Sequence, residues 1–257
     1  MFSVDRVHVP TEHRRMQRMT ELGRKTERVK NMRIWANRLA APAIVVSCAA
    51  GASADATIVY QNNFETPGGL GAWSNQTTSI TPVGNRSFLG EFSNEAVTLT
   101  VTDLPQHDSL RVQFSLYLIR TWDGNTDPGP DRWGMNVDSQ SVLDTTFTVS
   151  EPGNWRTQSY PMPFMEGNYP QRTGASEYNT LGYTWKGVPV DAVWEFDFTV
   201  EHIESMAEIS FWASGLQPIH DESWGMDNVV VSVSSVPAPG ILAITSGLGL
   251  FMARRRR

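Results

Sequence analysis

The chain has 257 residues, of which 40% are hydrophobic and 19% are charged, and it contains a single cysteine. This composition excludes a disulfide-stapled scaffold, a collagen-like repeat and a wholly disordered chain. The formal net charge of −6 hides an uneven distribution. Residues 1–54 carry ten Lys and Arg against four Asp and Glu, whereas residues 55–253 carry seven against 23, a net charge of −16. So acidic a central region disfavours nucleic-acid binding, which needs a basic footprint.

The sequence up to residue 54 predicts an export signal. Two arginines precede an apolar run at 39–50 that is too short to span a bilayer comfortably, and Ala52 and Ala54 form a small-x-small cleavage site. These are the three parts of a signal peptide, which we place at 32–54. Signal peptidase is therefore an expected partner, and Asp55 the expected mature N-terminus.

Two further features of the N-terminal region leave alternatives open. Residues 1–31 are polar and basic, which fits a disordered extension, a long n-region or a mis-assigned translation start ahead of Met32. Cys48 ends the run Val45-Val46-Ser47-Cys48, an order that resembles a bacterial lipoprotein box. The alternative hypothesis is therefore an envelope protein lipidated at Cys48.

The C-terminal segment 236–257 predicts a second targeting signal. An apolar run at 241–253 is short against the ~20 residues of a full membrane span, and the arginine cluster behind it is a cytoplasmic stop signal. The residues that define the segment are Pro237, Ala238 and Pro239 ahead of the run and Arg254, Arg255, Arg256 and Arg257 behind it.

This order resembles the PEP-CTERM sorting signal of Gram-negative bacteria, with Ala238 in the place of the usual glutamate. The resemblance implies an exported protein that a transmembrane helix anchors transiently in the inner membrane. An exosortase would then process it for the cell surface or the extracellular matrix. An ordinary C-terminal anchor is the alternative, and it predicts that the tail is retained.

The stretch 55–235 is expected to form one all-β domain, since its short alternating runs are bounded by Gly, Pro, Asn and Asp. Many strands with turns between them favour an antiparallel two-sheet β-sandwich of the jelly-roll or concanavalin-like type. Long connections are expected at 122–133 and 154–190. The expected strands are Thr57–Tyr60, Ala96–Thr102, Ser109–Ile119, Ser141–Val149, Val193–Ile203, Ala207–Trp212 and Asn228–Val233.

Two Trp-Gly-Met triplets, at 133–135 and 224–226, echo one another. Two copies are too few for a repeat protein. Each Trp-Gly pair is expected to open a strand, with the indole covering the edge of the core.

The ends of this domain resemble those of carbohydrate-binding-module-like jelly rolls. The matching residues are Tyr60–Glu65 with Gly71-Ala72-Trp73 at the start, and Asp221–Val229 at the end. The resemblance implies that the first and last strands are neighbours. It also implies that Glu65 and Asp227 share a structural Ca²⁺, with Asn63 as a further candidate.

A second calcium hypothesis comes from the loop at 123–131, which places oxygen-bearing side chains at alternate positions. Calcium takes six to eight oxygen ligands, and such a loop supplies several of them. The candidate ligands are Asp123, Asn125, Asp127 and Asp131. The alternative is a polar turn, in which these residue types are favoured for backbone reasons.

The segment 194–201 alternates between apolar and acidic residues. Trp194, Phe196, Phe198 and Val200 face one way, and Glu195, Asp197, Thr199 and Glu201 the other. Its acidic face resembles the E-x-D-x-x-E strand of laminarinase-like jelly-roll glycosidases, with a final spacing one residue longer. A divergent glycosidase that uses Glu195, Asp197 or Glu201 is therefore an alternative to a solvated strand face.

The sequence contains none of the metalloprotease, serine hydrolase, P-loop or dinucleotide-binding motifs, so we expect no catalysis. Aromatic residues are abundant, and sugar rings stack on exposed indoles. Trp122, Trp155 and Trp185 lie in the expected long loops and are the candidate ligand-binding residues, with Tyr160, Tyr169, Tyr178 and Tyr183 beside them. The expected function is that of an exported, non-catalytic β-sandwich of the cell surface or extracellular matrix, either a structural component or one that binds carbohydrate such as extracellular polysaccharide.

Overall fold

The computed structural model describes residues 56–150 and 155–235. All the described residues belong to one compact unit. The long strands are β1 (Thr57–Asn62), β3 (Ser87–Phe92), β4 (Ala96–Val101), β5 (Ser109–Arg120), β6 (Arg132–Val137), β7 (Gln140–Thr146), β13 (Asp191–Glu201), β14 (Ala207–Ser214) and β15 (Glu222–Ser234). Shorter elements are η3 (Leu70–Ala72), β2 (Thr78–Ile80), β8 (Thr157–Gln158), β9 (Tyr169–Pro170), β10 (Glu177–Tyr178), β11 (Thr184–Trp185) and β12 (Val188–Pro189).

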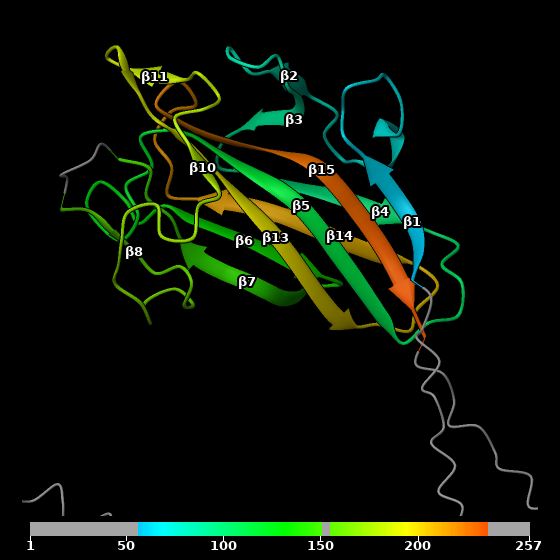
Figure 1. Ribbon diagram of the computed structural model, residues 1–257. Coiled ribbons are helices and arrows are strands. Elements are labelled where there is room, and N and C mark those ends of the chain that lie inside the picture. The colour runs from blue at the N-terminus through cyan, green and yellow to red at the C-terminus, as the bar shows by residue number, and fades with distance from the viewer. Residues whose placement is uncertain (1–55, 151–154, 236–257) are drawn as a thin grey trace, which may run out of the picture. The chain divides into compact units, whose positions relative to one another are not determined.

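The strands form two main antiparallel sheets that lie one in front of the other (Figure 1). The larger sheet has the order β10-β13-β5-β15-β3-β2, with β1 also paired to β15, and the smaller sheet has the order β4-β14-β6-β7. The pairs β8-β9 and β11-β12 stand apart from both sheets. The prediction of an all-β, two-sheet sandwich is confirmed.

Aromatic side chains from both sheets fill the space between them. The ring of Phe114 on β5 lies 5.2 Å from that of Phe211 on β14, and Trp133 on β6 lies 6.1 Å from Trp224 on β15. Both tryptophans are fully buried. Each Trp-Gly pair does lie at the start of a strand, as predicted, but the indoles meet inside the core and do not cover its edge.

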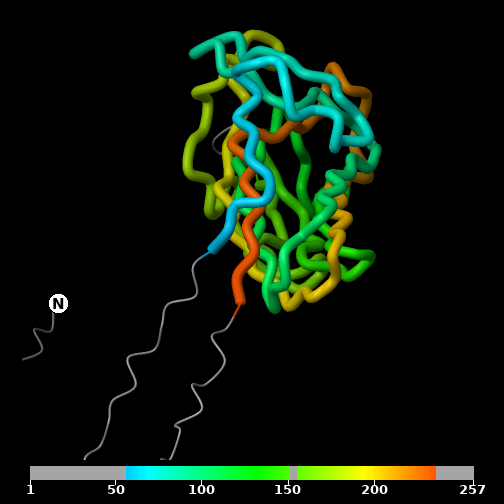
Figure 2. Tube along the Cα trace, turned by 90° about the vertical axis from the view of Figure 1, so that its right-hand side faces the viewer, coloured from blue at the N-terminus to red at the C-terminus, as the bar shows by residue number. Residues whose placement is uncertain are grey.

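The last strand organises the larger sheet. On one side β15 pairs with β5, and on the other it pairs first with β3 and then with β1. The change of partner coincides with a bulge in which Asn228 has a positive φ of 53°. Thr57 of β1 lies opposite Val233 of β15, so the first and last strands run side by side (Figure 2). This bears out the expectation that these strands are neighbours.

All seven predicted strands are present, with ends that differ by a few residues. The predicted strand at 228–233 is only the second half of β15, and that at 193–203 begins earlier, at Asp191. The alternation of β13 is confirmed, since Trp194 and Phe196 are buried whereas Glu195 and Asp197 are exposed. The 154–190 connection contains the two-residue strands β8 to β12, which are too short for sequence periodicity to reveal.

Candidate functional site

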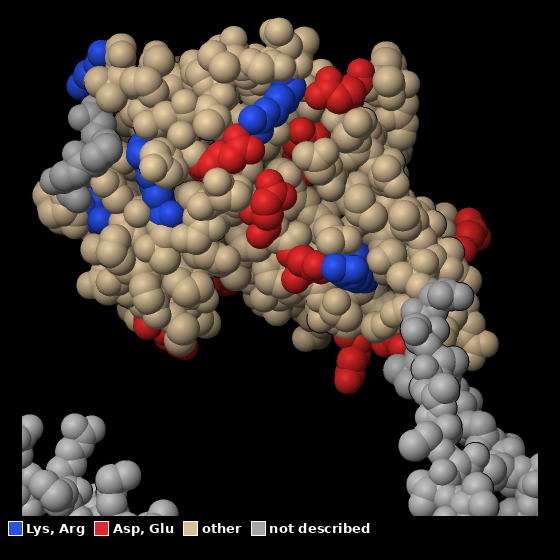
Figure 3. Space-filling view, viewed as in Figure 1, with Lys and Arg blue, Asp and Glu red and all other residues tan. Residues whose placement is uncertain are grey.

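A polar groove runs along the outer face of the larger sheet. Its volume is 380 Å³, and its polar lining consists of Gln113 on β5, Glu195 and Asp197 on β13, and Asn228 on β15. These side chains share one face because strand residues alternate between the two sides of a sheet. Figure 3 shows acidic and basic side chains gathered over β13, β5 and β15 on this face. The groove is therefore lined by groups that donate and accept hydrogen bonds.

Hydrogen bonds across neighbouring strands hold these groups in place. Arg111 Nε donates to Asp197 Oδ1 over 2.6 Å, and Gln113 Nε2 donates to Asp197 Oδ2 over 3.3 Å. Ser115 Oγ donates to Glu195 Oε2 over 2.9 Å and accepts from Asn228 Nδ2 over 3.2 Å. The groove therefore presents side chains whose positions are already set before any ligand arrives.

The geometry bears on the glycosidase alternative. The hydrogen bond from Arg111 lowers the pKa of the Asp197 carboxyl, which favours its ionised form. A retaining or inverting glycosidase needs one carboxylic acid with a raised pKa close to a second carboxylate. Asp197 is therefore unsuited to the role of that acid, and an ionised Asp197 leaves the role of the second carboxylate open.

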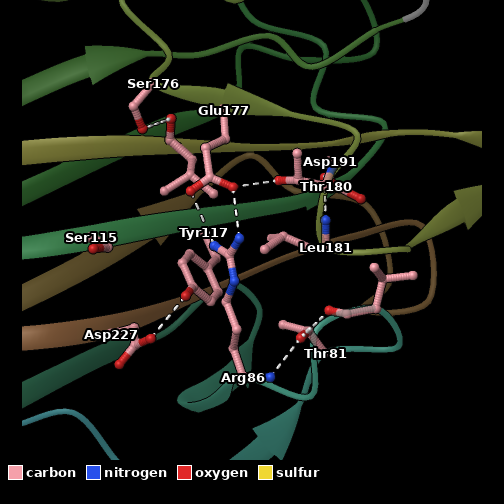
Figure 4. Close-up of polar contacts among 12 residues, drawn as sticks. Thr81, Arg86, Ser115, Tyr117, Ser176, Glu177, Thr180, Leu181, Asp191 and Asp227 are labelled. Carbon is pink, nitrogen blue, oxygen red and sulfur yellow. Dashed lines mark hydrogen bonds and ion pairs between the residues drawn. The ribbon is translucent and has the colours of Figure 1, made fainter.

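The segment 174–190 packs against the larger sheet, and Figure 4 shows its residues Glu177 and Leu181 close to Tyr117 of β5. Arg86 Nη1 and Nη2 donate to the two carboxylate oxygens of Glu177 over 3.2 and 2.8 Å, which joins the start of β3 to β10. Beneath this pair, Tyr117 Oη donates to Asp227 Oδ2 over 2.8 Å. Tyr117 also belongs to a small apolar cluster with Leu181 and residues of β3, β5 and β13. This segment thus has a core of its own.

Glu65 and Asp227, the calcium pair that the family resemblance implies, lie in one neighbourhood. Burial raises the pKa of the Asp227 carboxyl, hydrogen bonds from Tyr117 and the Asn228 amide oppose this, and the negative charge of Glu65 raises it further. Glu65 Oε1 accepts from the Ser87 amide over 3.0 Å. Asn63 Oδ1 accepts from the Glu65 amide over 3.4 Å, a turn contact. Calcium at this pair stays a prediction.

The loop at 123–131 does not bring its four predicted calcium ligands together. Asp123 and Asp131 converge, and their oxygens lie within 4.8 Å of one another and of Glu222 at the start of β15. Asn125 does not join them, because its Oδ1 accepts from Thr146 Oγ1 and Ser159 Oγ. Asp127 is exposed. Asp123 and Asp131 thus come together without Asn125 and Asp127, for which calcium ligation stays a prediction.

Sequence reasoning missed Glu222, which lies more than 90 residues beyond that loop. The sequence signal that could have found it is the repeated Trp-Gly pair, because a carboxylate precedes each pair and the two carboxylates lie close together in the fold. Asp131 precedes Trp133 by two residues, and Glu222 precedes Trp224 by two. Burial raises the pKa of both carboxyls, and the charge of Asp131 adds to the rise at Glu222.

The three candidate tryptophans have different surroundings. Trp122 is fully buried, and its Nε1 donates to the Ser223 carbonyl over 2.9 Å. It offers no ring face to solvent, so its prediction as a sugar-stacking residue is wrong. Trp155 is 75% exposed, and Trp185 is half-buried with Lys186 Nζ 5.5 Å from its ring centroid. For these two residues sugar stacking stays a prediction.

The predicted signal peptide, Cys48 and the sorting tail lie outside the described residues. Within 56–150 and 155–235, no helix combines the length and apolar character needed to cross a bilayer.

Comparison with known proteins finds similarity in solved structures alone. No family model and no curated protein matches the chain. Dimeric latent PorU from Porphyromonas gingivalis is 8% identical over 71% of this chain, with a TM-score of 0.37, and this chain spans 13% of PorU. A cleaved adhesin domain of Lys-gingipain from the same organism is 14% identical, with coverages of 68% and 99% and a TM-score of 0.34.

A carbohydrate-binding module of lichenase 5A from Cellvibrio mixtus, solved with cellotriose, is 10% identical. The match covers 68% of this chain and 97% of that module, with a TM-score of 0.29. These similarities assign neither a ligand nor an activity to this chain.

Proposed function

We propose that the chain is an exported, non-catalytic β-sandwich that binds carbohydrate in the groove lined by Gln113, Glu195, Asp197 and Asn228. The observation that carries the proposal is the row of preorganised amide and carboxylate groups on the exposed face of the larger sheet. Sugars present dense arrays of hydroxyl groups, each of which donates and accepts. A few fixed polar groups are what such a ligand requires.

Export rests on the two ends of the chain. The signal peptide at 32–54 and the PEP-CTERM-like tail at 236–257 direct the sandwich to the cell surface or the extracellular matrix, with signal peptidase and an exosortase as partners. Mass spectrometry of the protein from its host tests this part of the proposal. Cleavage before Asp55 and loss of the arginine cluster support it. An intact tail supports a simple anchor, and a lipid on Cys48 supports the lipoprotein alternative.

The groove is tested by binding of the full-length chain to a panel of immobilised polysaccharides. Gln113→Ala removes one amide, and Asn228→Gly removes another while keeping a residue that tolerates its positive φ of 53°. Each loses about 1–2 kcal/mol of binding free energy, or roughly five- to thirty-fold in affinity. Equal binding by wild type and both variants, or no binding by wild type, contradicts the proposal.

The matched control is Glu201→Gln, which changes an exposed carboxylate on the same strand outside the groove. It should bind like wild type. The same samples are assayed for released reducing sugar. Cleavage that is present in wild type and lost in Glu195→Gln would establish the glycosidase alternative.

A further inference from the structure

A buried group of three carboxylates lies away from the carbohydrate groove. Asp123 follows β5, Asp131 precedes β6, and Glu222 begins β15, so both sheets and the connection between them contribute. One oxygen of each residue lies within 4.8 Å of the others. The spacing is that of groups arranged around a common point.

Two oxygens of this group have no hydrogen-bond partner among the residues that the structure describes. Asp131 and Glu222 are both 0% exposed, and within 56–150 and 155–235 Asp131 Oδ1 and Glu222 Oε1 accept from no donor. Their other oxygens are satisfied, because Asp131 Oδ2 accepts from the Asp123 amide and Glu222 Oε2 accepts from the Gln217 amide over 2.7 Å. Buried polar atoms are nearly always paired, so two unpaired oxygens beside one another indicate a missing partner.

The charges point to the same conclusion. Arg156 Nη1 pairs with Asp123 Oδ1 and is the basic side chain at the cluster. One guanidinium beside three buried carboxyl groups leaves two of them without a cationic partner, and their ionised forms are costly in a protein interior unless a cation is bound.

We propose that Asp123, Asp131 and Glu222 form a divalent-cation site that takes calcium. Calcium prefers carboxylate oxygens and accepts six to eight ligands in flexible geometry, so three carboxylates with waters or backbone carbonyls satisfy it. Magnesium demands a stricter octahedral shell and binds such a site less well. The proposal does not depend on carbohydrate binding.

The cation would cross-link parts of the chain that are distant in sequence. It joins the loop after β5 to the start of β15, where the strand meets Trp122 through the Ser223 carbonyl. Arg156 supplies the alternative positive charge when the cation is absent. Removing this internal competitor therefore strengthens calcium binding, whereas removing a ligand abolishes it.

The test is calorimetric titration of the chelator-treated full-length chain with CaCl₂ and with MgCl₂. We expect a calcium event that raises the Tm by roughly 5–11 °C at a hundred-fold excess over Kd. Glu222→Gln and Asp131→Asn lose this event, and Arg156→Gln binds at least as tightly as wild type. Absence of calcium binding in wild type, or undiminished binding in Glu222→Gln, overturns the proposal.

Two controls separate this site from other acidic groups. Glu204→Gln removes an exposed turn carboxylate, and Asp227→Asn removes the other candidate calcium residue. Both should keep the calcium event, and its loss in Asp227→Asn alone would move the site to the Glu65 pair. If the ligand variants fail to fold, a crystal structure of wild type grown with calcium decides. Density for an ion between the three carboxylates supports the site, and the Arg156 guanidinium in that position refutes it.

Discussion

The Asp191 carboxylate holds the part of the segment 174–190 that packs against the larger sheet. It is fully buried and accepts four backbone amide hydrogens, from Thr180 and Leu181 on Oδ1 and from Gly182 and Tyr183 on Oδ2, over 2.9–3.1 Å. Figure 4 shows the contact with this segment beside Glu177 and Tyr117. The isosteric change Asp191→Asn retains two acceptor bonds and turns an NH₂ group toward two N–H donors.

The expected cost follows from the two lost bonds. A hydrogen bond to a charged group contributes about 1.5–3 kcal/mol, so Asp191→Asn should lower the free energy of unfolding by about 3–6 kcal/mol. For a domain of this size the Tm falls by roughly 6–24 °C. Denaturant unfolding of the full-length chain measures the first quantity, and hydrogen exchange at 180–183 should show faster exchange in this segment than in β5.

Asp103→Asn is the matched control, because it makes the same chemical change at an exposed turn residue with a φ of 57° that asparagine tolerates. It should change stability by less than about 0.5 kcal/mol. If Asp191→Asn costs less than about 1 kcal/mol, or if amides 180–183 keep their wild-type protection, the carboxylate does not hold this segment and the reasoning fails.

Three further predictions concern other parts of the sandwich. Gly215→Ala should cost about 2 kcal/mol or more, because Gly215 has a φ of +91° and an added Cβ would lie 2.0 Å from the Pro130 carbonyl oxygen. His107→Ala should cost about 1–3 kcal/mol, because it removes the buried 2.6 Å contact between its Nε2 and His202 Nδ1. Glu177→Gln should cost no more than about 1 kcal/mol at pH 7, since the Arg86 pair is partly solvent-screened.

The Glu177 effect has a defined pH window. The hydrogen bonds from Arg86 lower the pKa of the Glu177 carboxyl below its ordinary 4.5, so the unfolded state binds more protons than the folded state in the acid range. Its stabilisation is therefore complete above about pH 4.5 and is lost as the pH falls through the folded pKa. Equal stability differences between wild type and Glu177→Gln at pH 7 and pH 3 would contradict this.

The matched controls for Gly215→Ala and His107→Ala make the same substitution at positions that lack the contact in question. Gly187→Ala introduces the same strain at a φ of +82° with no atom within 4 Å of the new Cβ, so the excess cost of Gly215→Ala measures the clash. His220→Ala changes an exposed histidine and should be nearly neutral. If each pair of variants unfolds alike, neither contact stabilises the fold.

Much of the architecture could be predicted because a β-strand with one buried face has a local sequence pattern, the alternation of apolar and polar residues. The alternation along β13 required one buried and one solvated face, and the structure has both. Strand β3 escaped notice because Gly90 interrupts its pattern with a φ of +146°, where an added Cβ would lie within 3.0 Å of the Trp224 carbonyl. That glycine is required by the approach of β15, which is a tertiary fact that no local pattern records.

For the candidate sites, too, local features could be predicted from the sequence, whereas contacts between distant residues could not. Polar residues on one face of β13 could be assigned to a surface from the sequence, but their hydrogen-bond partners on β5 and β15 depend on strand order. Trp122 lies two residues past the end of β5, in the loop where it was expected, but its indole is buried in the core and is not available to a ligand. Asn125 has the right chemistry for a cation, but neighbouring hydroxyl groups occupy its oxygen.

The acidic charge of the sandwich argues for a cation at one place in particular. Five of the seven basic residues in 55–253 form ion pairs within the described residues, namely Arg86, Arg111, Arg120, Arg132 and Arg156. The first four each neutralise a partly exposed carboxylate, where water would have screened the charge at little cost. Only the Arg156 pair involves a buried cluster, and there a single guanidinium meets three carboxylates. The carboxyl groups that lack a cationic partner are thus concentrated where water cannot solvate them, which is the condition under which a bound cation contributes most to folding.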